Sequence, residues 1–255
     1  MLKVGIFGAT SAIAQEVAKC FSNTGAELFL VARSLEKLNA VRDDLKARGA
    51  NGVATYVADL TDLQLHQTIF DKALSTMGHL DAVLIAHGIL PDQQKGESNV
   101  SDLLDSYNTN CISVLSLLTI LANYFESEKR GCLAVITSVA GDRGRRSNYI
   151  YGSAKGAVDL FLQGLRSRMH GAGVSVVTIK PGFVDTPMTA GVPKNFLFAT
   201  PQRVGDSIFK AMRGRKDTVY VPWYWRPIMS VIKWIPEFFF KRLSSINRVE
   251  SKPYV

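Results

Sequence analysis

Residues 3–18 read KVGIFGATSAIAQEVA, and this stretch decides the fold. Its apolar run Lys3–Phe7 is typical of a buried strand, Gly8 permits a tight turn, and a helical pattern begins at Ala12. Small residues in such a turn let the backbone approach a pyrophosphate, and free N–H groups at the helix start face its negative charge. The stretch predicts a dinucleotide-binding unit, although similar turns also occur in α/β proteins that bind no nucleotide.

The same alternation of apolar runs and helical patterns continues along the 255 residues. The runs are continuously apolar, as in strands buried on both faces, and strands that alternate with helices form a parallel sheet. We predict strands at Lys3–Phe7, Glu27–Ala32, Val53–Val57, Ala82–Ala86, Cys132–Thr137, Val174–Ile179 and Thr218–Val221. Helices are predicted at Ala12–Asn23, Leu35–Arg48, Leu63–Met77, Val100–Glu128 (with or without a break), Tyr151–His170 and Gln202–Met212. The expected fold is one α/β domain, a Rossmann-type doubly wound parallel sheet over residues 1–221, followed by an amphipathic C-terminal segment, 222–255.

The end of the second predicted strand indicates which dinucleotide binds. A fold that prefers NAD usually places Asp or Glu there to hold the ribose hydroxyls. Here the chain continues into Arg33 and Ser34, with no acidic residue. A guanidinium makes charge-assisted contacts to a 2′-phosphate, so the sequence predicts NADP(H) as cofactor. The alternative interpretation is a solvated surface arginine.

A candidate catalytic group lies in the second half of the chain. Tyr151 and Lys155 are four residues apart on a predicted helix, and Ser138 follows the strand before it. A neighbouring ammonium favours the phenolate, and an oxidised nicotinamide would add to this effect. We therefore expect both together to bring the pKa of Tyr151 toward the working pH. A Tyr and a Lys at this spacing alone are more often just an exposed helix face. The serine upstream and the nucleotide-binding turn make the combination specific.

With these motifs the chain resembles the short-chain dehydrogenase/reductase family over nearly its whole length. The resemblance implies hydride transfer between a nicotinamide and a ketone carbon, with Tyr151 giving the proton to oxygen. Lys155 would hold the ribose, Ser138 would orient the carbonyl, and Asn110 would keep a water against Lys155. Besides Tyr151 and Lys155, the expected cofactor-binding residues are Gly8, Thr10, Ser11, Ala12, Ile13, Arg33, Asp59, Leu60, Ala86, Gly88, Pro181, Gly182, Val184 and Thr186.

The chain departs from the family pattern at two places. Ala12 and Ala14 stand where the family has its second and third motif glycines, which adds a methyl group to each position. We expect these small side chains to be tolerated, with some loss of cofactor affinity. His87 replaces the usual small or amide residue of the N-A-G turn, which Ala86-His87-Gly88 resembles, and we interpret it as a structural residue rather than a catalyst.

Three arginines lie in the loop between Ser138 and Tyr151. A guanidinium cluster beside a substrate cleft suits a phosphorylated substrate. A solubilising loop and a contact between subunits are equally compatible with the pattern. The candidate substrate residues are Arg143, Arg145 and Arg146.

The C-terminal segment combines aromatic and basic residues. It holds all three tryptophans of the chain, and its net charge of +4 is half of the +8 of the whole protein. This combination is typical of the membrane interface, while an oligomer contact or a lid over the cleft are the alternatives. Both the arginine loop and this segment resemble the decaprenylphosphoryl-2-keto-ribose reductase subgroup. That resemblance implies reduction of a keto-sugar carried by a polyprenyl phosphate; reduction of another ketone would use the same residues.

The remaining properties of the sequence restrict the possible partners and the location of the protein. Three widely spaced cysteines indicate a reducing compartment, and neither a signal peptide nor a membrane-spanning run is visible, so we expect a cytoplasmic protein or one peripheral on the inner face of the membrane. No metal site is expected, and no nucleic-acid motif accompanies the positive charge. The family resemblance implies a homo-oligomer. A dinucleotide-binding regulator that has lost catalysis is the alternative to an enzyme.

Overall fold

The computed structural model describes residues 1–243, so the part of the predicted C-terminal segment from 244 to 255 lies outside the described residues. Within the described chain, seven strands form one sheet in the order β3-β2-β1-β4-β5-β6-β7, and every neighbouring pair is parallel. The order reverses at β1, which is the doubly wound arrangement that the sequence predicts. The strands are β1 Lys3–Phe7, β2 Glu27–Ala32, β3 Gly52–Val57, β4 Ala82–Ile85, β5 Cys132–Ile136, β6 Ser175–Pro181 and β7 Thr218–Val221.

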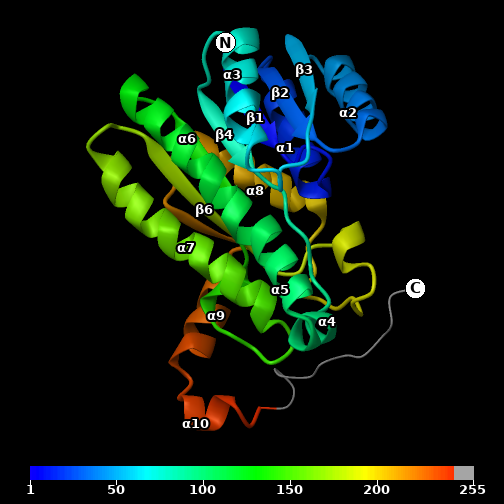
Figure 1. Ribbon diagram of the computed structural model, residues 1–255, viewed down its shortest axis with the longest axis vertical. Coiled ribbons are helices and arrows are strands. Elements are labelled where there is room, and N and C mark those ends of the chain that lie inside the picture. The colour runs from blue at the N-terminus through cyan, green and yellow to red at the C-terminus, as the bar shows by residue number, and fades with distance from the viewer. Residues whose placement is uncertain (244–255) are drawn as a thin grey trace.

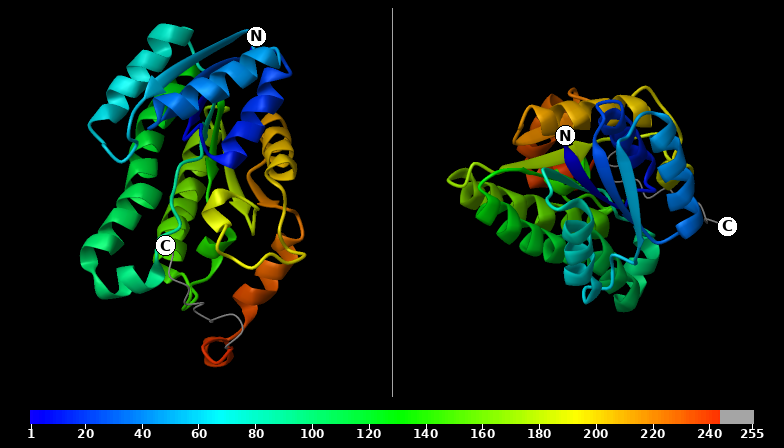
Figure 2. Two further views of the ribbon diagram at one scale, coloured as in Figure 1. Left: turned by 90° about the vertical axis from the view of Figure 1, so that its right-hand side faces the viewer. Right: turned by 90° about the horizontal axis from the view of Figure 1, so that it is seen from above.

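Helices cover both faces of the sheet (Figures 1 and 2). One face packs against α1, α2 and α8, and the other packs against α3, α6 and α7. Adjacent strand residues divide between the two cores: on β5, Ala134 belongs to the first core and Leu133 to the second. The apolar runs are continuous because both faces are buried. The helices are α1 Ala12–Ser22, α2 Leu35–Ala47, α3 Leu65–Met77, α4 Gln93–Ser98, α5 Val100–Tyr107, α6 Ser113–Glu128, α7 Tyr149–His170, α8 Pro201–Arg213, α9 Trp225–Trp234 and α10 Glu237–Phe240.

The long helix predicted from Val100 to Glu128 is interrupted. Residues Asn108–Ile112 form a π-helical turn between α5 and α6, and α4 is a further short helix that the pattern does not predict. A π-turn inserts one extra residue into the helix and changes the direction in which the following side chains point. The interruption therefore determines where the side chain of Asn110 lies.

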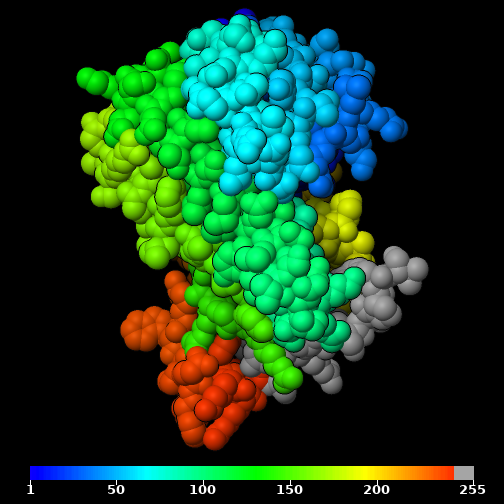
Figure 3. Space-filling view, viewed as in Figure 1, coloured from blue at the N-terminus to red at the C-terminus, as the bar shows by residue number. Residues whose placement is uncertain are grey.

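The C-terminal segment begins after β7 and projects from the body of the molecule (Figure 3). Trp225 and Met229 of α9 are buried against Val139, which follows the end of β5. This contact attaches the segment beside the carboxyl ends of the strands. No helix among residues 1–243 is long and apolar enough to cross a membrane.

Candidate active site

Ser138, Tyr151 and Lys155 meet at the carboxyl end of β5. Ser138 follows this strand, and α7 runs back along it so that Tyr151 and Lys155 face the strand end. The Ser138 hydroxyl is hydrogen-bonded to the Tyr151 phenol. The Lys155 Nζ atom donates to the carbonyl of Ile136 at 3.2 Å and lies 5.9 Å from the centroid of the Tyr151 ring. The three residues that the sequence singles out thus share one site.

Asn110 joins this group from the π-turn. It is fully buried, and its Oδ1 atom accepts a hydrogen bond from the Ile89 amide at 3.0 Å. A Cβ atom placed on Gly88 would lie 2.8 Å from the same oxygen and 3.3 Å from Lys155 Nζ. Gly88 therefore lets the loop after β4 pass between Asn110 and Lys155, and any larger residue would push these groups apart.

Burial has the largest effect on the pKa values of Tyr151 and Lys155. Desolvation raises the pKa of Tyr151 to about 12, which the hydrogen bond with Ser138 offsets only in part. Desolvation also lowers the pKa of Lys155 to about 8. In the protein alone the phenol is therefore not acidic, because withdrawal from water outweighs an ammonium 5.9 Å from the ring. Tyr151 holds its proton at neutral pH.

The predicted dinucleotide turn lies next to this group. Gly8 has a φ of +85°, and a Cβ atom there would lie 2.6 Å from the backbone nitrogen of His87, so the turn after β1 touches the turn after β4. Ser11 begins α1 but its side chain makes no capping hydrogen bond. The N–H groups of Ala12 and Ile13 in the first turn are thus left for an anion, as a pyrophosphate requires. Ala14 is fully buried in the core beneath α1 and its methyl group is accommodated there.

The far end of this cradle is formed by the ends of β2 and β3. The guanidinium of Arg33 lies 3.9 Å from the Asp59 carboxylate, and both side chains are largely exposed. Leu60, which follows Asp59, is buried, and its carbonyl contacts a ring nitrogen of His66 at 3.0 Å. Arg33 is thus an accessible cation at the position where an adenosine phosphate would be bound.

His87 has the contacts of a structural residue. Its Nε2 atom lies 2.8 Å from the Ser113 hydroxyl, and burial followed by the charge of Lys155 lowers its pKa to about 3. The imidazole is therefore neutral at physiological pH. Its Nδ1 atom is buried and has no hydrogen-bond partner among residues 1–243.

The stretch after β6 closes the other side of the site. Pro181 ends the strand, Val184 is buried and forms a bridge with Ala199, and Thr186 begins a short 3₁₀ turn. A Cβ atom on Gly182 would lie 1.9 Å from the indole nitrogen of Trp225, so only glycine fits against this ring. Sequence reasoning missed Trp225 as a site residue. The aromatic cluster after β7 was the available signal, but nothing in the pattern tells which ring turns inward.

The three loop arginines do not act as one cluster. Arg143 donates hydrogen bonds to the carbonyls of Ile232 and Ile235. It also forms an ion pair with Glu237, and its guanidinium lies 3.8 Å from the centre of the Phe240 ring. These contacts hold Arg143 against the end of α9 and against α10. They correct its prediction as a substrate-binding residue.

The other two arginines of the loop remain candidate substrate contacts. Burial lowers the pKa of Arg145, and its Nε atom has no hydrogen-bond partner among the described residues. Arg146 is exposed.

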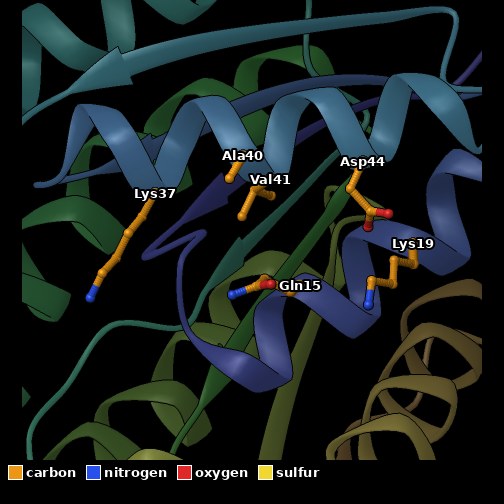
Figure 4. Close-up of a pocket in the computed structure, with 6 residues that line it drawn as sticks. All are labelled: Gln15, Lys19, Lys37, Ala40, Val41 and Asp44. Carbon is orange, nitrogen blue, oxygen red and sulfur yellow. The ribbon is translucent and has the colours of Figure 1, made fainter.

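A hollow of about 350 Å³ lies between α1 and α2, away from the catalytic group. In Figure 4, Gln15 and Lys19 of α1 lie on one side of it, and Lys37, Ala40, Val41 and Asp44 of α2 lie on the other. None of the residues predicted for catalysis or cofactor binding lines this hollow, so it belongs to the outer surface of the fold.

Comparisons with known proteins found a family model and relatives that cover most of the chain. The family model described as short chain dehydrogenase matches residues 3–195. An uncharacterized oxidoreductase of Mycobacterium tuberculosis is 36% identical over 240 residues, which cover 94% of this chain and 96% of that protein. An uncharacterized oxidoreductase of Streptomyces coelicolor is 34% identical over 241 residues, covering 93% and 94%.

Solved structures show the same fold. A short-chain type dehydrogenase/reductase from Mycobacterium ulcerans superposes with a TM-score of 0.76 at 21% identity, over 86% of this chain and 88% of that one. An alcohol dehydrogenase from the archaeon Thermococcus sibiricus, complexed with 5-hydroxy-NADP, superposes with a TM-score of 0.77 at 19% identity, over 86% and 96%. At these identities the likeness extends to the fold alone.

Burial of the Lys155 ammonium predicts that this residue destabilises the protein at neutral pH. Because the pKa is about 8 in the folded protein and 10.5 in the unfolded chain, the unfolded chain binds more protons between these values. The free energy of unfolding therefore carries a penalty that is complete below pH 8 and disappears as the pH rises to 10.5. We expect Lys155→Met to raise the free energy of unfolding by about 1–3 kcal/mol at pH 7. Urea denaturation at several pH values measures this gain.

The matched control is Lys72→Met on the exposed surface of α3, which should change stability by less than about 0.5 kcal/mol. The gain from Lys155→Met should shrink steadily above pH 8. A gain that stays constant with pH, or a variant less stable than wild type at pH 7, contradicts the assigned burial cost.

Proposed function

This chain belongs to the short-chain dehydrogenase family, and we propose that it is an oxidoreductase that reduces a ketone to an alcohol with NADPH. The observation that carries the proposal is the convergence of Ser138, Tyr151 and Lys155 on one site, with the Asn110 amide behind them. The dinucleotide, when bound, supplies the hydride. The oxidoreductase names of the M. tuberculosis and S. coelicolor relatives support the reaction class.

The residues of the site divide the proton chemistry among them. Tyr151 is protonated at neutral pH, since burial raises its pKa, and it can donate this proton to the carbonyl oxygen of the substrate. Ser138, hydrogen-bonded to the same phenol, orients and polarises that carbonyl. Lys155 places a cation beside the phenolate that remains and holds the ribose of the cofactor. Asn110, which lies in the π-turn, keeps a water against Lys155.

NADP is the proposed cofactor because of the residues at the end of β2. Arg33 is exposed there, and no acidic residue lies at the carboxyl end of β2 or directly after it, where it would bind the ribose hydroxyls. Asp59 lies 3.9 Å from Arg33 on the neighbouring strand end and can keep the guanidinium in position. The archaeal alcohol dehydrogenase of the same fold is complexed with an NADP analogue, which supports the same choice.

For the substrate, we propose a keto-sugar carried by a polyprenyl phosphate. Two features support this class over a small free ketone. Arg145 and Arg146 lie in the loop that joins Ser138 to Tyr151, and guanidinium groups suit a phosphodiester. The C-terminal segment beside the site offers a surface for the lipid. A different lipid ketone would use the same residues.

An exposed apolar stripe on the C-terminal segment supports contact with a lipid surface. Trp225 and Met229 of α9 face the protein, but Trp223, Val231 and Trp234 are 73%, 67% and 86% exposed. The stripe continues onto α10, and exposed basic residues flank it. The apolar members are Trp223, Val231, Trp234, Phe238 and Phe239, and the basic ones are Arg226, Lys233, Lys241 and Arg242. Such a surface suits an anionic membrane.

The proposed proton donor is tested by Tyr151→Phe. Loss of the hydroxyl should lower kcat for NADPH-dependent reduction of phenanthrenequinone by about 100- to 10,000-fold, because no other group protonates the carbonyl oxygen. The Kd for NADPH, followed by its fluorescence, should stay near the wild-type value. Tyr149→Phe is the control and should keep full activity. Tyr149 is a partly exposed tyrosine two residues before Tyr151 on α7.

Retained activity of Tyr151→Phe would refute the role of the phenol. Tight NADPH binding by wild type without reduction of any ketone in a panel would favour the non-catalytic regulator instead.

The cofactor assignment is tested by Arg33→Ser. Removal of a charge-assisted contact to the 2′-phosphate should raise the Kd for NADPH by about 10- to 100-fold and leave the Kd for NADH nearly unchanged. Arg48→Ser at the end of α2 is the control, because this arginine is engaged with Asp44 at 3.0 Å. If NADH binds more tightly than NADPH to wild type, the assignment is incorrect.

The lipid surface is tested by the double variant Trp223→Ser, Trp234→Ser. Flotation with vesicles of phosphatidylglycerol and phosphatidylcholine should show dissociation constants higher by about 10-fold or more than for wild type. Phe196→Ser, which changes an aromatic residue that is 91% exposed outside the segment, should leave binding unaltered. If the double variant binds vesicles as wild type does and no longer self-associates in sedimentation, the stripe is a contact between subunits and not a lipid surface.

A further inference from the structure

A buried ion network lies directly behind the catalytic group. The Lys180 Nζ atom donates to Asp142 Oδ1 at 2.5 Å and to Asp159 Oδ2 at 2.7 Å. The Tyr220 hydroxyl donates to the second oxygen of Asp142 at 2.7 Å. The exposed fractions of the Lys180, Asp142 and Asp159 side chains are 7%, 2% and 13%. One ammonium therefore holds two carboxylates in a region with little access to water.

The members of the network come from the segments that carry the proposed chemistry. Asp142 ends the 3₁₀ turn Val139–Asp142, and Ser138 is the first residue before that turn. Asp159 lies on the same face of α7 as Tyr151 and Lys155, because the three follow one another at a spacing of four residues. Lys180 lies on β6 directly before Pro181, which ends the strand, and Gly182 follows.

Stability alone does not require these charges. Burial of an ion pair costs desolvation, and apolar side chains of the same volume often stabilise a protein equally well. An ion pair differs from apolar packing in that it sets distances and directions between the groups it joins. Here it joins the serine loop to the catalytic helix through Lys180 of β6.

We propose that Lys180 is a positioning residue for ketone reduction, and that its ammonium sets the separation between Ser138 and Tyr151. Asp142 transmits the constraint to the serine loop, and Asp159 transmits it to α7. Tyr220 orients the Asp142 carboxylate so that one oxygen faces Lys180. This role rests on the proposed function, but the geometry that it predicts can be measured without turnover.

The test compares wild type with Lys180→Met in two measurements. Loss of the ammonium should lower kcat for phenanthrenequinone by about 100-fold, since displacement of a reacting group by about 1 Å has this effect, while the Kd for NADPH stays close to the wild-type value. Crystal structures of both proteins should show the hydrogen bond between Ser138 and Tyr151 in wild type and its loss in the variant. If Lys180→Met does not fold, Asp142→Asn, which keeps the side-chain size and removes one charge, takes its place in both measurements.

The matched control is Arg166→Met. Arg166 also joins α7 to β6, through hydrogen bonds to the Thr178 hydroxyl at 2.7 Å and the Val176 carbonyl at 3.0 Å, but it lies about 22 Å along the helix from Tyr151. It should lower the melting temperature and leave kcat unaltered.

An unchanged kcat in the network variant, or a retained hydrogen bond between Ser138 and Tyr151, overturns the positioning role. A wild-type protein that binds NADPH and reduces no ketone contradicts the proposed function instead, and the two crystal structures still decide the positioning.

Discussion

Withdrawal of Lys155 from water is the constraint on which the site depends. Lys155 is 3% exposed, the hydrogen bond of its ammonium to the Ile136 carbonyl replaces only part of its hydration, and its pKa falls to about 8. Gly88 and Asn110 lie close beside it, since a Cβ atom on Gly88 would lie 3.3 Å from the Lys155 Nζ atom and 2.8 Å from Asn110 Oδ1. The stability of the rest of the fold offsets this desolvation cost. Enzymes commonly lose some stability in order to hold a functional group where the chemistry needs it. Bound ribose hydroxyls and a phenolate are the partners that would relieve the cost.

The fold and the core of the site were predictable from the sequence because both follow from local periodicity. Continuous apolar runs that alternate with helices leave few arrangements other than a parallel sheet, and the carboxyl ends of its strands lie along one edge. Gly8, Arg33 and Ser138 each follow such a strand, and the spacing of Tyr151 and Lys155 places them on one helix face.

The rest depends on tertiary contacts that no local pattern contains. The π-turn at Asn110 looks like ordinary helix in the sequence, and the inward orientation of Trp225 depends on the space left by Gly182. Arg143 resembles a substrate residue until α9 and α10 are seen to cover it. The raised pKa of Tyr151 in the protein alone could not be predicted, because spacing shows the neighbouring charge but not the depth of burial. Asp142 and Arg143 are adjacent, and they connect the serine loop to the core and to the C-terminal segment respectively.

The transfer of isotope from cofactor to product tests the central claim most directly. Wild-type protein is incubated with a ketone and NADPH deuterated at C4 of the nicotinamide, each epimer separately, and the alcohol is analysed by mass spectrometry. The account predicts deuterium on the carbinol carbon from one epimer and none from the other, because the ketone is held on one face of the bound ring. Alcohol formed without deuterium from either epimer, or no alcohol at all, would contradict it.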